Sequence, residues 1–480
     1  MGKSLAELAR TLGTDPQPNW NDVTITGIGH DSRRTSPGEL FVAIPGFTAD
    51  GHDYIDDAVS RGAAAVVCER AVTTTVPTII VTNARVALAR LAAAFFNEPT
   101  RALFTVGVTG TNGKTTVCHL SAHILGETDT ALLSTVALEQ QGIHAVTTPE
   151  PTFIQQFAHQ ALREGKNNLV IEVSSAGLAL HRTDFVDFDV AVFTNLTHDH
   201  LDFHPDWNSY LQAKLRLFQG LKSDAVALVN LDDPASSRFT AATQARVITY
   251  AIHRKADLRA CGIEYGLRET NFTLQTEKGT VKVRIQFPAE HNVYNALAAA
   301  GVGLAKGIRL DEIAEALRTA RPVVGRHQTF RAATGATVIV DFAHSPDSLE
   351  RMLRFLRLRY QRVICVFGCG GGSDREKRPL MGRISGSLAD ITILTTDNPK
   401  DESPARIIDE IENGIRGTAG KYERIIDRKD AIRRAIGLSG PGDVVLLAGK
   451  GHEPYQIVGH EFVPYSDAGF ITEEGLATPE

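Results

Sequence analysis

A glycine-rich turn joins an apolar strand to a helix between residues 103 and 125. Residues 103–108 (LFTVGV) form the apolar run, GTNGKTT follows at residues 110–116, and residues 117–125 have a helical pattern. In this order, backbone N–H groups and a helix N-terminus converge on phosphate oxygens. The sequence therefore predicts a phosphate-binding turn at the edge of a parallel α/β sheet.

The turn supplies the groups that hold a nucleoside triphosphate. The Lys114 ammonium is a point charge for phosphate oxygens, and the Thr115 hydroxyl can bind Mg²⁺. One residue departs from the strict pattern, because Val108 stands where a glycine is expected five residues before Gly113. We expect ATP as the nucleotide, although the turn alone also allows GTP. The expected ATP contacts of the turn are Gly110, Thr111, Asn112, Gly113, Lys114, Thr115 and Thr116.

The length of 480 residues predicts about three domains at about 150 residues each. In residues 1–98, 99–322 and 323–480, short β-branched runs alternate with helical patterns, which predicts the α/β class for each part. We expect a mostly parallel sheet around the phosphate-binding turn and a Rossmann-like α/β domain at the C-terminal end. Between residues 247 and 287, alternating strands with little helix predict an antiparallel addition.

The composition excludes several classes of protein. Hydrophobic residues make up 43% and charged residues 22%, with a formal net charge of −6. No global positive field is available to attract nucleic acid, so an anionic ligand must be held locally. The longest apolar run is too short to span a membrane. Five cysteines without zinc-type spacing fit a reducing compartment, so we expect a cytoplasmic protein without nucleic acid partners or membrane insertion.

Polar residues follow two further strands of the central part. Glu172 opens the sequence EVSS after one strand, and TNLTHDHLD begins at Thr194 after the next. Ligands of open α/β sheets gather at the carboxyl ends of the strands, and Mg²⁺ prefers carboxylate, hydroxyl and phosphate oxygens. We expect Thr115 and Glu172 to hold a first Mg²⁺ with the nucleotide, and His200 to serve a second ion. The alternative for His200 and its neighbours is a structural hydrogen-bonded cluster.

The ordered motifs of the chain are similar to those of the Mur ligases, and the likeness covers nearly the whole sequence. It rests on HDSRR at residues 30–34, GTNGKTT at 110–116, TTPE at 147–150, EVSS at 172–175, TNLTHDHLDFH at 194–204, YLQAKLRLF at 210–218, HNVYNALAA at 291–299, VDFAHSPDSLE at 340–350, KRPLMG at 377–382, DNPK at 397–400 and GKGHEPYQ at 449–456. So many matches in one order make chance agreement negligible. The resemblance implies the three-domain architecture of that family.

The resemblance also implies an ATP-dependent amide-bond ligase of peptidoglycan synthesis. The motifs are most similar to those of the enzymes that add a diamino acid to UDP-N-acetylmuramoyl-L-alanyl-D-glutamate. ATP would phosphorylate the free D-glutamate carboxylate, and the incoming amine would attack the acyl phosphate. Two Mg²⁺ ions and Lys114 would neutralise the transferring phosphoryl group. Lys214 matches a lysine that the family carbamylates with CO₂, which converts a cation into an oxygen ligand for Mg²⁺.

Carried over residue by residue, the resemblance implies a full set of contacts. The implied catalytic residues are Lys114, Glu172, His200 and Lys214, and the implied metal ligands are Thr115, Glu172, His200 and carbamylated Lys214. The implied ATP contacts outside the turn are Asn292, Asn295, Arg326, Asp341 and His344, and those to the UDP-substrate are Ser32, Thr147, Thr148, Ser174 and Arg182. The chain departs from the family at Ala176, where a histidine is usual, and at Leu180, where a polar residue is usual.

The third part of the chain must select the incoming amino acid. The implied contacts are Arg375, Asp397, Asn398, Pro399, Lys400, Gly449 and Glu453. Family members that add meso-diaminopimelate have an arginine at the position of Lys400, and lysine-adding members have a small neutral residue. Lys400 keeps the positive charge but loses the bidentate fork of arginine. Charge therefore favours diaminopimelate, while lysine and ornithine remain alternatives.

Two alternatives to this function remain at the level of sequence. One is another ligase of the same superfamily, such as folylpolyglutamate synthase or a different Mur-like ligase. The other is a phosphate-binding-loop NTPase that acts as a switch, which would need neither Lys214 nor an amine site. We expect a monomer.

Overall fold

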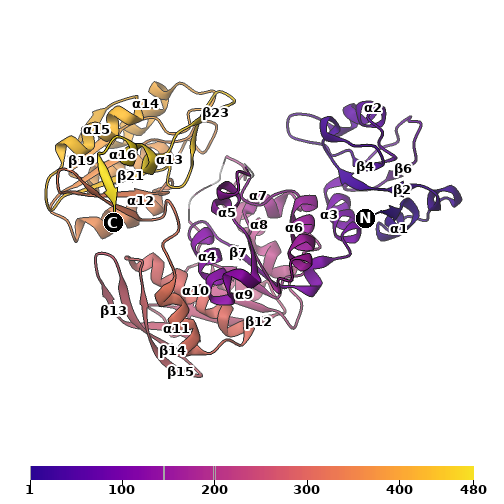
Figure 1. Ribbon diagram of the computed structural model, residues 1–480. Helices are drawn as coiled ribbons and strands as arrows, with labels where there is room; N and C mark the ends of the chain where they lie inside the picture. Colours follow the sequence, from indigo (N-terminus) through magenta and orange to yellow (C-terminus); the bar gives the residue numbers. More distant parts are fainter. Residues whose placement is uncertain (1, 144–145, 198, 200–201) are drawn as a thin grey trace.

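The computed structural model describes residues 2–143, 146–197, 199 and 202–480. Within these ranges the chain builds three large sheets of four, nine and seven strands, each with helices packed against it (Figure 1). We propose domain limits at residues 1–98, 99–322 and 323–480, because the strands of each sheet fall within one of these ranges. No described helix is long and apolar enough to cross a membrane.

The first domain carries a parallel sheet in the order β3-β4-β5-β6. Alternation along β4 places Leu40 and Val42 in the core with α1 and α3, and Phe41 in the core with α2. The elements of this domain are β1 (Lys3–Ser4), α1 (Leu5–Thr11), β2 (Thr24–Ile25), β3 (Gly27–Gly29), β4 (Glu39–Val42), α2 (Ile55–Ser60), β5 (Ala65–Cys68), β6 (Thr78–Ile80) and α3 (Ala84–Phe95).

The central domain has a sheet in the order β15-β14-β13-β12-β11-β10-β7-β9-β8. Its strands are β7 (Phe104–Thr109), β8 (Thr130–Leu133), β9 (Asn168–Glu172), β10 (Val190–Phe193), β11 (Val226–Asn230), β12 (Arg246–Ala251), β13 (Leu258–Tyr265), β14 (Thr270–Thr276) and β15 (Gly279–Ile285). Its helices are α4 (Lys114–Leu125), α5 (Thr135–Gln140), α6 (Pro151–Arg163), α7 (Ser175–Ala179), α8 (Trp207–Gln219), α9 (Ser236–Ala241), α10 (Glu290–Lys306) and α11 (Leu310–Thr319). This arrangement confirms the predicted mostly parallel sheet around the phosphate-binding turn.

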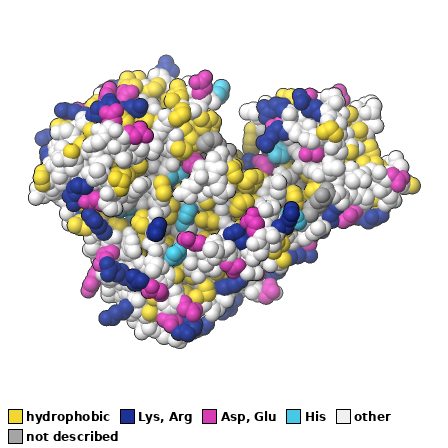
Figure 2. Space-filling view, in the orientation of Figure 1, with side chains coloured by type: hydrophobic (Ala, Val, Ile, Leu, Met, Phe, Trp, Pro, Cys, Tyr) yellow, Lys and Arg dark blue, Asp and Glu magenta, His cyan; other side chains and the backbone are white. Residues whose placement is uncertain are grey.

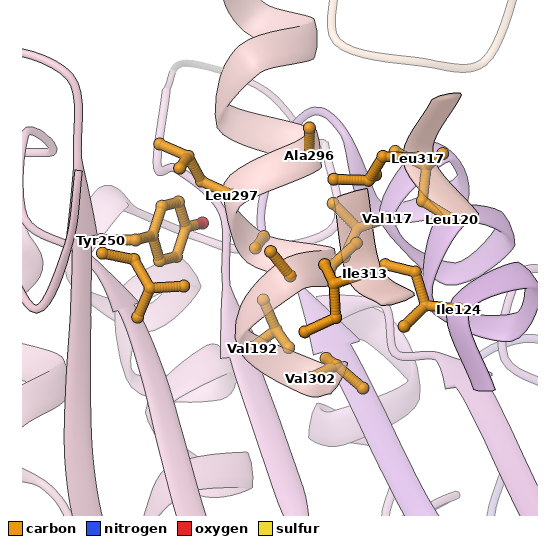
Figure 3. Packing of buried hydrophobic residues seen from close by; sticks show 14 of the residues in the cluster. Val117, Leu120, Ile124, Val192, Tyr250, Ala296, Leu297, Val302, Ile313 and Leu317 are labelled. Carbon is orange, nitrogen blue, oxygen red and sulfur yellow. The ribbon is translucent and has the colours of Figure 1, made fainter. Parts of the chain in front are cut away.

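Both faces of the sheet are buried at β7, β9, β10 and β11, which explains the near-continuous apolar runs of these strands. Along β10, Val192 faces the core formed with α4, α10 and α11, whereas Phe193 faces the core formed with α6 and α8. In the first core, Val117 of α4 points toward Leu317 of α11, and Val302 of α10 points toward Val192 (Figure 3). The helix that follows the phosphate-binding turn is therefore fixed on two sides.

The predicted antiparallel addition between residues 247 and 287 is only partly correct. Strand β12 pairs in parallel with β11, and β13 pairs in parallel with β12. Only the pairs β13–β14 and β14–β15 are antiparallel. Alternating hydrophobicity marks a strand with one buried face, but it does not determine the direction in which that strand joins its neighbour.

The C-terminal domain has a mixed sheet in the order β20-β19-β18-β21-β17-β16-β24, in which β16 pairs antiparallel with both of its neighbours. Its strands are β16 (Gln328–Ala332), β17 (Thr337–Asp341), β18 (Val363–Phe367), β19 (Ile391–Leu394), β20 (Lys421–Arg424), β21 (Val444–Ala448) and β24 (Ala477–Pro479), with a separate hairpin of β22 (Tyr455–Val458) and β23 (Glu461–Pro464). The helices are α12 (Pro346–Arg357), α13 (Lys377–Leu388), α14 (Pro404–Ile415), α15 (Arg428–Leu438) and α16 (Asp467–Glu473). Helices α12, α13 and α14 cover one face, and α15 and α16 cover the other.

The carboxyl ends of the central and C-terminal sheets face each other. Asn112, after β7, donates to Asp347 Oδ2 at the start of α12 (3.0 Å). His344, after β17, has its Nε2 atom 3.7 Å from Asp199 Oδ2 beyond β10. Ligand sites of open α/β sheets lie at these strand ends, so the two domains bring two such edges to one boundary.

A buried ion pair fixes the last helix of the C-terminal domain. Arg428 contacts Asp467 through Nε (2.8 Å) and Nη2 (2.7 Å), and their side chains are 1% and 0% exposed. The Tyr465 hydroxyl also donates to Asp467 Oδ1 (2.7 Å). Arg428 Nη2 donates in addition to the carbonyl of Ala448 at the end of β21 (3.0 Å).

We expect Asp467→Ala to lower the free energy of unfolding by about 3–5 kcal/mol, because it leaves the buried Arg428 charge unpaired. The double variant Arg428→Met/Asp467→Leu should lose less, since no unpaired charge remains. Urea unfolding followed by circular dichroism measures both. As a control, Asp409→Ala removes an exposed partner of Arg424 and should change stability by less than about 1 kcal/mol. A similar loss in Asp467→Ala and Asp409→Ala would contradict this account.

Candidate active site

The phosphate-binding turn leaves no space for side chains at two of its glycines. Gly110 and Gly113 have φ angles of 152° and 88°. A Cβ atom at Gly110 would lie 1.9 Å from Thr194 Oγ1, and one at Gly113 would lie 2.5 Å from Asn295 Oδ1. Helix α4 begins directly after Gly113, so the turn presents its backbone N–H groups at the helix N-terminus.

Polar contacts from the neighbouring strand ends hold the turn. The backbone N–H of Thr111 donates to the carbonyl of Asn195 (2.8 Å), and the backbone N–H of Asn112 donates to Asn195 Oδ1 (2.9 Å). The Lys114 ammonium donates to the carbonyls of Gly110 (3.1 Å) and Thr111 (2.8 Å). Burial lowers the pKa of Lys114, and Glu172 and Asp199 oppose that shift. The lysine is therefore folded back over the turn.

Thr115 and Glu172 lie together, as the strand order predicts. The Thr115 hydroxyl donates to Glu172 Oε1 (3.0 Å) and accepts from Arg326 Nη2 (3.2 Å). Glu172 Oε2 accepts from the backbone N–H (3.1 Å) and the hydroxyl (3.3 Å) of Thr135. A hydroxyl and a carboxylate beside a phosphate-binding turn form the oxygen donor set that suits Mg²⁺. His200, the residue predicted for a second ion, lies outside the described residues.

Lys214 reaches the same turn from helix α8. Its Nζ atom donates to the carbonyl of Gly110 (2.9 Å) and lies 4.5 Å from the centre of the Tyr210 ring. Its side chain is buried, with the whole residue 1% exposed. Burial holds the pKa of Lys214 well below its usual range, and the charge of Lys114 lowers it further. The lysine is thus placed where its uncharged amine is favoured.

A cavity of about 720 Å³ lies between the central and C-terminal domains. Its lining includes the predicted ATP contacts Asn112, Gly113, Thr116, Asn292, Asn295, Arg326 and Asp341. Asn295 Nδ2 donates to Asn292 Oδ1 (3.1 Å), so these two residues share one face of α10. Asp341 Oδ2 accepts from the backbone N–H of His327 (2.7 Å), and burial raises the pKa of Asp341. Figure 2 shows histidine side chains on the molecular surface near this boundary.

A second polar cluster lies at the carboxyl end of β9, directly before helix α7. The Thr148 hydroxyl donates to the Glu172 carbonyl (2.9 Å), and the backbone N–H of Ser174 donates to the Thr148 hydroxyl (2.8 Å). Arg182 donates to the Thr148 carbonyl (3.0 Å) and pairs with Glu150 Oε1 (2.6 Å). The structure therefore brings together three predicted substrate contacts, Thr148, Ser174 and Arg182, with Glu150 as a fourth member.

The first domain approaches this cluster through His30. The charges of Glu150 and Arg182 act on the pKa of His30, which is lowered overall by burial. Ser32, two residues further, is buried and hydrogen-bonds to Asp57. Thr147 is half-buried beside Thr148. HDSRR and TTPE, recognised as separate motifs in the sequence, therefore meet at the boundary of two domains.

Two loops of the C-terminal domain form a connected hydrogen-bond network. The Lys450 ammonium donates to Asn398 Oδ1 (2.8 Å) and Glu453 Oε2 (2.6 Å). Asn398 Nδ2 donates to Glu453 Oε2 (2.9 Å). A Cβ atom at Gly449 would lie 2.4 Å from Asp397 Oδ2, so the DNPK and GKGHE segments are in direct contact. The family resemblance implies no role for Lys450, although it stands in the GKGHE motif.

Lys400 and Arg375 have different surroundings. Lys400 has a φ angle of 50° and exchanges backbone hydrogen bonds with Ile457 and Gly459 beside the β22–β23 hairpin. The Pro399 carbonyl closely approaches Gly371, which places the DNPK segment against the glycine-rich loop after β18. Arg375 is exposed and forms an ion pair with Glu410.

Sequence reasoning missed several buried charged groups near these loops. Arg378 is fully buried and pairs with Glu402 and Glu410, and the buried Lys377 has its Nζ atom 3.9 Å from Asp199 Oδ1. Both belong to the KRPLMG motif, which contributes to the family resemblance but for which no role was predicted. Glu139 of α5 contacts Tyr455 across the domain boundary, and no motif includes it.

Comparison with known proteins gives the class of this arrangement. Residues 24–96 match the family model described as Mur ligase family, catalytic domain, residues 108–303 match Mur ligase middle domain, and residues 325–451 match Mur ligase, glutamate ligase domain. The fold and its two facing sheet edges are those of an ATP-dependent ligase. The chain belongs to the Mur ligase family.

Individual relatives agree with this assignment. The chain is 43% identical over 455 residues to the UDP-N-acetylmuramoyl-L-alanyl-D-glutamate–2,6-diaminopimelate ligase of Geobacillus kaustophilus, which covers 92% of this chain and 93% of the relative. A solved structure named as the same kind of ligase has a TM-score of 0.68 at 29% identity and covers 98% of both chains. A structure of MurF from Acinetobacter baumannii, at 22% identity and a TM-score of 0.68, covers 93% of this chain and 95% of that one and shares the fold.

We expect Gly113→Ala to weaken ATP binding at least tenfold, because a Cβ atom would lie 2.5 Å from Asn295 Oδ1 at a positive φ angle. Titration calorimetry with ATP and Mg²⁺ measures the dissociation constant. Gly437→Ala is the matched control, since a Cβ at Gly437 meets no atom within 4 Å. Equal ATP affinity in the two variants would show that the close packing of the turn is not needed for nucleotide binding.

Proposed function

We propose that this chain joins meso-diaminopimelate to UDP-N-acetylmuramoyl-L-alanyl-D-glutamate through an acyl phosphate. The single observation that carries the proposal is the opposition of two sheet edges, one with a phosphate-binding turn and one with a charged amino-acid network. The names and coverage of the relatives support the same substrates. ATP would transfer its terminal phosphoryl group to the D-glutamate carboxylate, and an amine held by the opposite edge would attack the product.

Positioning and charge neutralisation explain how the central edge could assist phosphoryl transfer. We infer that Lys114 neutralises phosphate oxygens and that Arg326, which contacts Thr115 from the C-terminal domain, acts at the same point. Thr115 and Glu172 would hold Mg²⁺, which when bound offsets the negative charge of the phosphates. Because Arg326 comes from the C-terminal domain, we infer that this site is complete only when the two domains are in contact.

We propose that Lys214 carries a carbamate in the active protein. An uncharged amine is the form that attacks CO₂, giving an N–COO⁻ group and releasing a proton. Burial and the neighbouring Lys114 charge favour that uncharged amine at Lys214. The modification would add anionic oxygens at the Lys214 amine beside Gly110, which suits a site that binds Mg²⁺.

The cluster of Thr148, Ser174 and Arg182 is our candidate for the muramoyl-peptide site. Arg182 is already paired with Glu150, so its guanidinium is oriented before substrate binds. Ser32 and the HDSRR segment would contact the uridine diphosphate part, since His30 lies near this cluster from the first domain. The substrate would then extend from the first domain to the Glu172 end of the central sheet.

We propose that Lys400 contributes to selection of diaminopimelate over lysine and ornithine. Its backbone is held by contacts to Ile457 and Gly459, two residues along the chain from Asn398, which contacts Glu453. A positive charge attracts the second carboxylate of diaminopimelate and repels the ammonium at the end of lysine. Arg375 would add a second cation only after leaving Glu410.

The alternatives raised by the sequence are less well supported than this proposal. Identity of 43% across 92% of the chain favours a diaminopimelate ligase over folylpolyglutamate synthase. A nucleotide switch would have no use for a network in which the buried Lys450 binds Asn398 and Glu453 opposite the turn. We retain a monomer as a proposal.

An amino-acid panel tests the proposed function. Purified protein is given ATP, Mg²⁺ and UDP-N-acetylmuramoyl-L-alanyl-D-glutamate with meso-diaminopimelate, L-lysine or L-ornithine, and phosphate release and tripeptide product are measured together. We expect strict dependence on both substrates and the highest kcat/KM with diaminopimelate. Phosphate release without the muramoyl-dipeptide would favour the switch, and a preference for lysine would overturn the assigned amino acid.

We expect Lys400→Ala to lower kcat/KM for diaminopimelate by about tenfold to a hundredfold, the effect of losing one charge-assisted contact of about 1.5–3 kcal/mol. The KM for ATP should stay within about twofold of the wild-type value. Lys421→Ala, which removes an exposed lysine of β20, is the matched control. Equal use of diaminopimelate before and after the Lys400 substitution would remove this residue from the specificity site.

Lys214→Ala should reduce turnover at least a thousandfold, because no carbamate can form. Short-chain carboxylic acids added to this variant should restore part of the rate by supplying anionic oxygens in the vacated space. Steady-state rates with and without acetate measure the effect, and wild type with acetate is the control. Full activity of the unsupplemented variant would refute the carbamate.

A further inference from the structure

We propose that Glu139 is a further catalytic residue, whose carboxylate accepts the proton that the incoming ammonium group must release before it attacks the acyl phosphate. The proposal rests on the ligase function proposed above. Glu139 lies on the short helix α5 of the central domain and belongs to none of the recognised motifs. Its assignment comes from its position at the domain boundary.

Glu139 meets the C-terminal domain at the segment that carries the amino-acid network. The Tyr455 hydroxyl donates to Glu139 Oε1 (3.1 Å), and His452 Nε2 lies 3.4 Å from Glu139 Oε2. The side chains of Glu139 and His452 are 7% and 2% exposed. Glu453 and Lys450 stand in the same segment, so contact between the domains brings the Glu139 carboxylate to the amino-acid loops.

Three buried atoms at this contact have no hydrogen-bond partner among the described residues. They are Glu139 Oε2 and the two ring nitrogens of His452. Leaving a buried polar atom unpaired costs about 1–3 kcal/mol, so such atoms call for a functional explanation. An ammonium donor bound at this boundary would satisfy Glu139 Oε2.

Glu139 also lies close to the phosphoryl-transfer end of the site. Thr135 at the start of α5 donates to Glu172 Oε2, and Glu139 is four residues later on the same helix face. On the opposite side, the charges of Arg326 and Lys450 both act on His452. Glu139 therefore stands between the carboxylate that serves the phosphoryl end and the network that would hold the amino acid.

The reaction needs a proton acceptor at this place. An alkyl ammonium group has a pKa of about 10, so about one molecule in a thousand carries a free amine at neutral pH. Only the free amine has the electron pair that attacks the acyl carbon. A general base positioned beside the ammonium typically contributes about 10²–10⁴-fold to the rate.

The pKa values of the two side chains favour Glu139 over His452 as the proton acceptor. Burial, with a smaller contribution from the Glu453 charge, raises the pKa of Glu139 to about 7, although the Tyr455 hydrogen bond and the Lys450 charge oppose the shift. Burial and the surrounding cations lower the pKa of His452 to about 3, so its imidazole is a weak acceptor. Glu139 is ionised above neutral pH and is more basic than an exposed glutamate.

One ammonium N–H bond breaks, its proton moves to Glu139 Oε2, and the electron pair stays on nitrogen. That pair forms the C–N bond to the acyl carbon, and the C–O bond to the phosphoryl group then breaks. The second N–H proton leaves with the phosphate, and Glu139 returns its proton to water when the product departs.

The test compares Glu139→Gln with wild type for two nucleophiles. Meso-diaminopimelate needs deprotonation, whereas hydroxylamine is uncharged at neutral pH and traps the acyl phosphate as a hydroxamate without a base. We expect the variant to lose at least about a hundredfold in kcat with diaminopimelate while its hydroxamate rate stays within about twofold of wild type. Glu164→Gln, at an exposed glutamate after α6, is the matched control and should ligate at the wild-type rate.

The outcomes separate this proposal from the proposed function. If wild type forms no hydroxamate with ATP and the muramoyl-dipeptide, the acyl phosphate function fails and this proposal fails with it. If wild type is trapped but Glu139→Gln ligates diaminopimelate at the wild-type rate, only the role of Glu139 is overturned. Equal losses with both nucleophiles would also overturn it, because they indicate a structural role in the site.

A pH profile gives a second, independent readout. The ionised carboxylate is the active form, so kcat/KM for diaminopimelate should rise through about pH 7 in wild type. Tyr455→Phe removes a donor that stabilises the carboxylate, so this inflection should move to higher pH. Glu139→Gln should lack it and rise only toward the pH at which the free amine forms. An unchanged inflection in both variants would contradict the proposal.

Discussion

Two lysines converge on one backbone carbonyl, and the chemistry of the site follows from that crowding. Lys114 and Lys214 donate to the Gly110 oxygen at 3.1 and 2.9 Å. Burial and mutual repulsion lower the pKa of Lys214, and burial lowers that of Lys114. The turn thus holds two amines whose positive charge is disfavoured unless an anion is bound. We propose that a triphosphate stabilises the charge of Lys114 and that Lys214 reacts as the uncharged amine to form a carbamate.

The turn alone is only half of the site. Arg326 donates to Thr115, Asp347 accepts from Asn112, and Tyr455 donates to Glu139, so the C-terminal domain supplies groups at several points of the central edge. These contacts bring the loops proposed to bind the amino acid to the boundary that also holds the proposed phosphoryl site. Ligation requires this arrangement, because an acyl phosphate exposed to water would hydrolyse before an amine reached it. We therefore propose that contact between the two domains couples phosphoryl transfer to amino-acid binding.

The sequence predicts the parts of the structure that depend on local pattern. The α/β class, the turn and the proximity of Thr115 to Glu172 follow from strand periodicity and from the gathering of ligands at strand ends. The parallel pairing of β12 with β13 could not be predicted, because alternation does not encode strand direction. Glu139 was also missed, since its partners His452 and Tyr455 lie in another domain and only the packing of the two domains brings them together.

Isotope transfer from the substrate carboxylate to phosphate tests the central claim most directly. UDP-N-acetylmuramoyl-L-alanyl-D-glutamate labelled with ¹⁸O in the free glutamate carboxylate is converted with ATP, Mg²⁺ and diaminopimelate, and the released phosphate is analysed by mass spectrometry. Phosphorylation of that carboxylate predicts one ¹⁸O atom in each phosphate formed by wild type, and neither product nor labelled phosphate with Lys114→Ala. Product formed with unlabelled phosphate, or undiminished ligation by Lys114→Ala, would contradict the account.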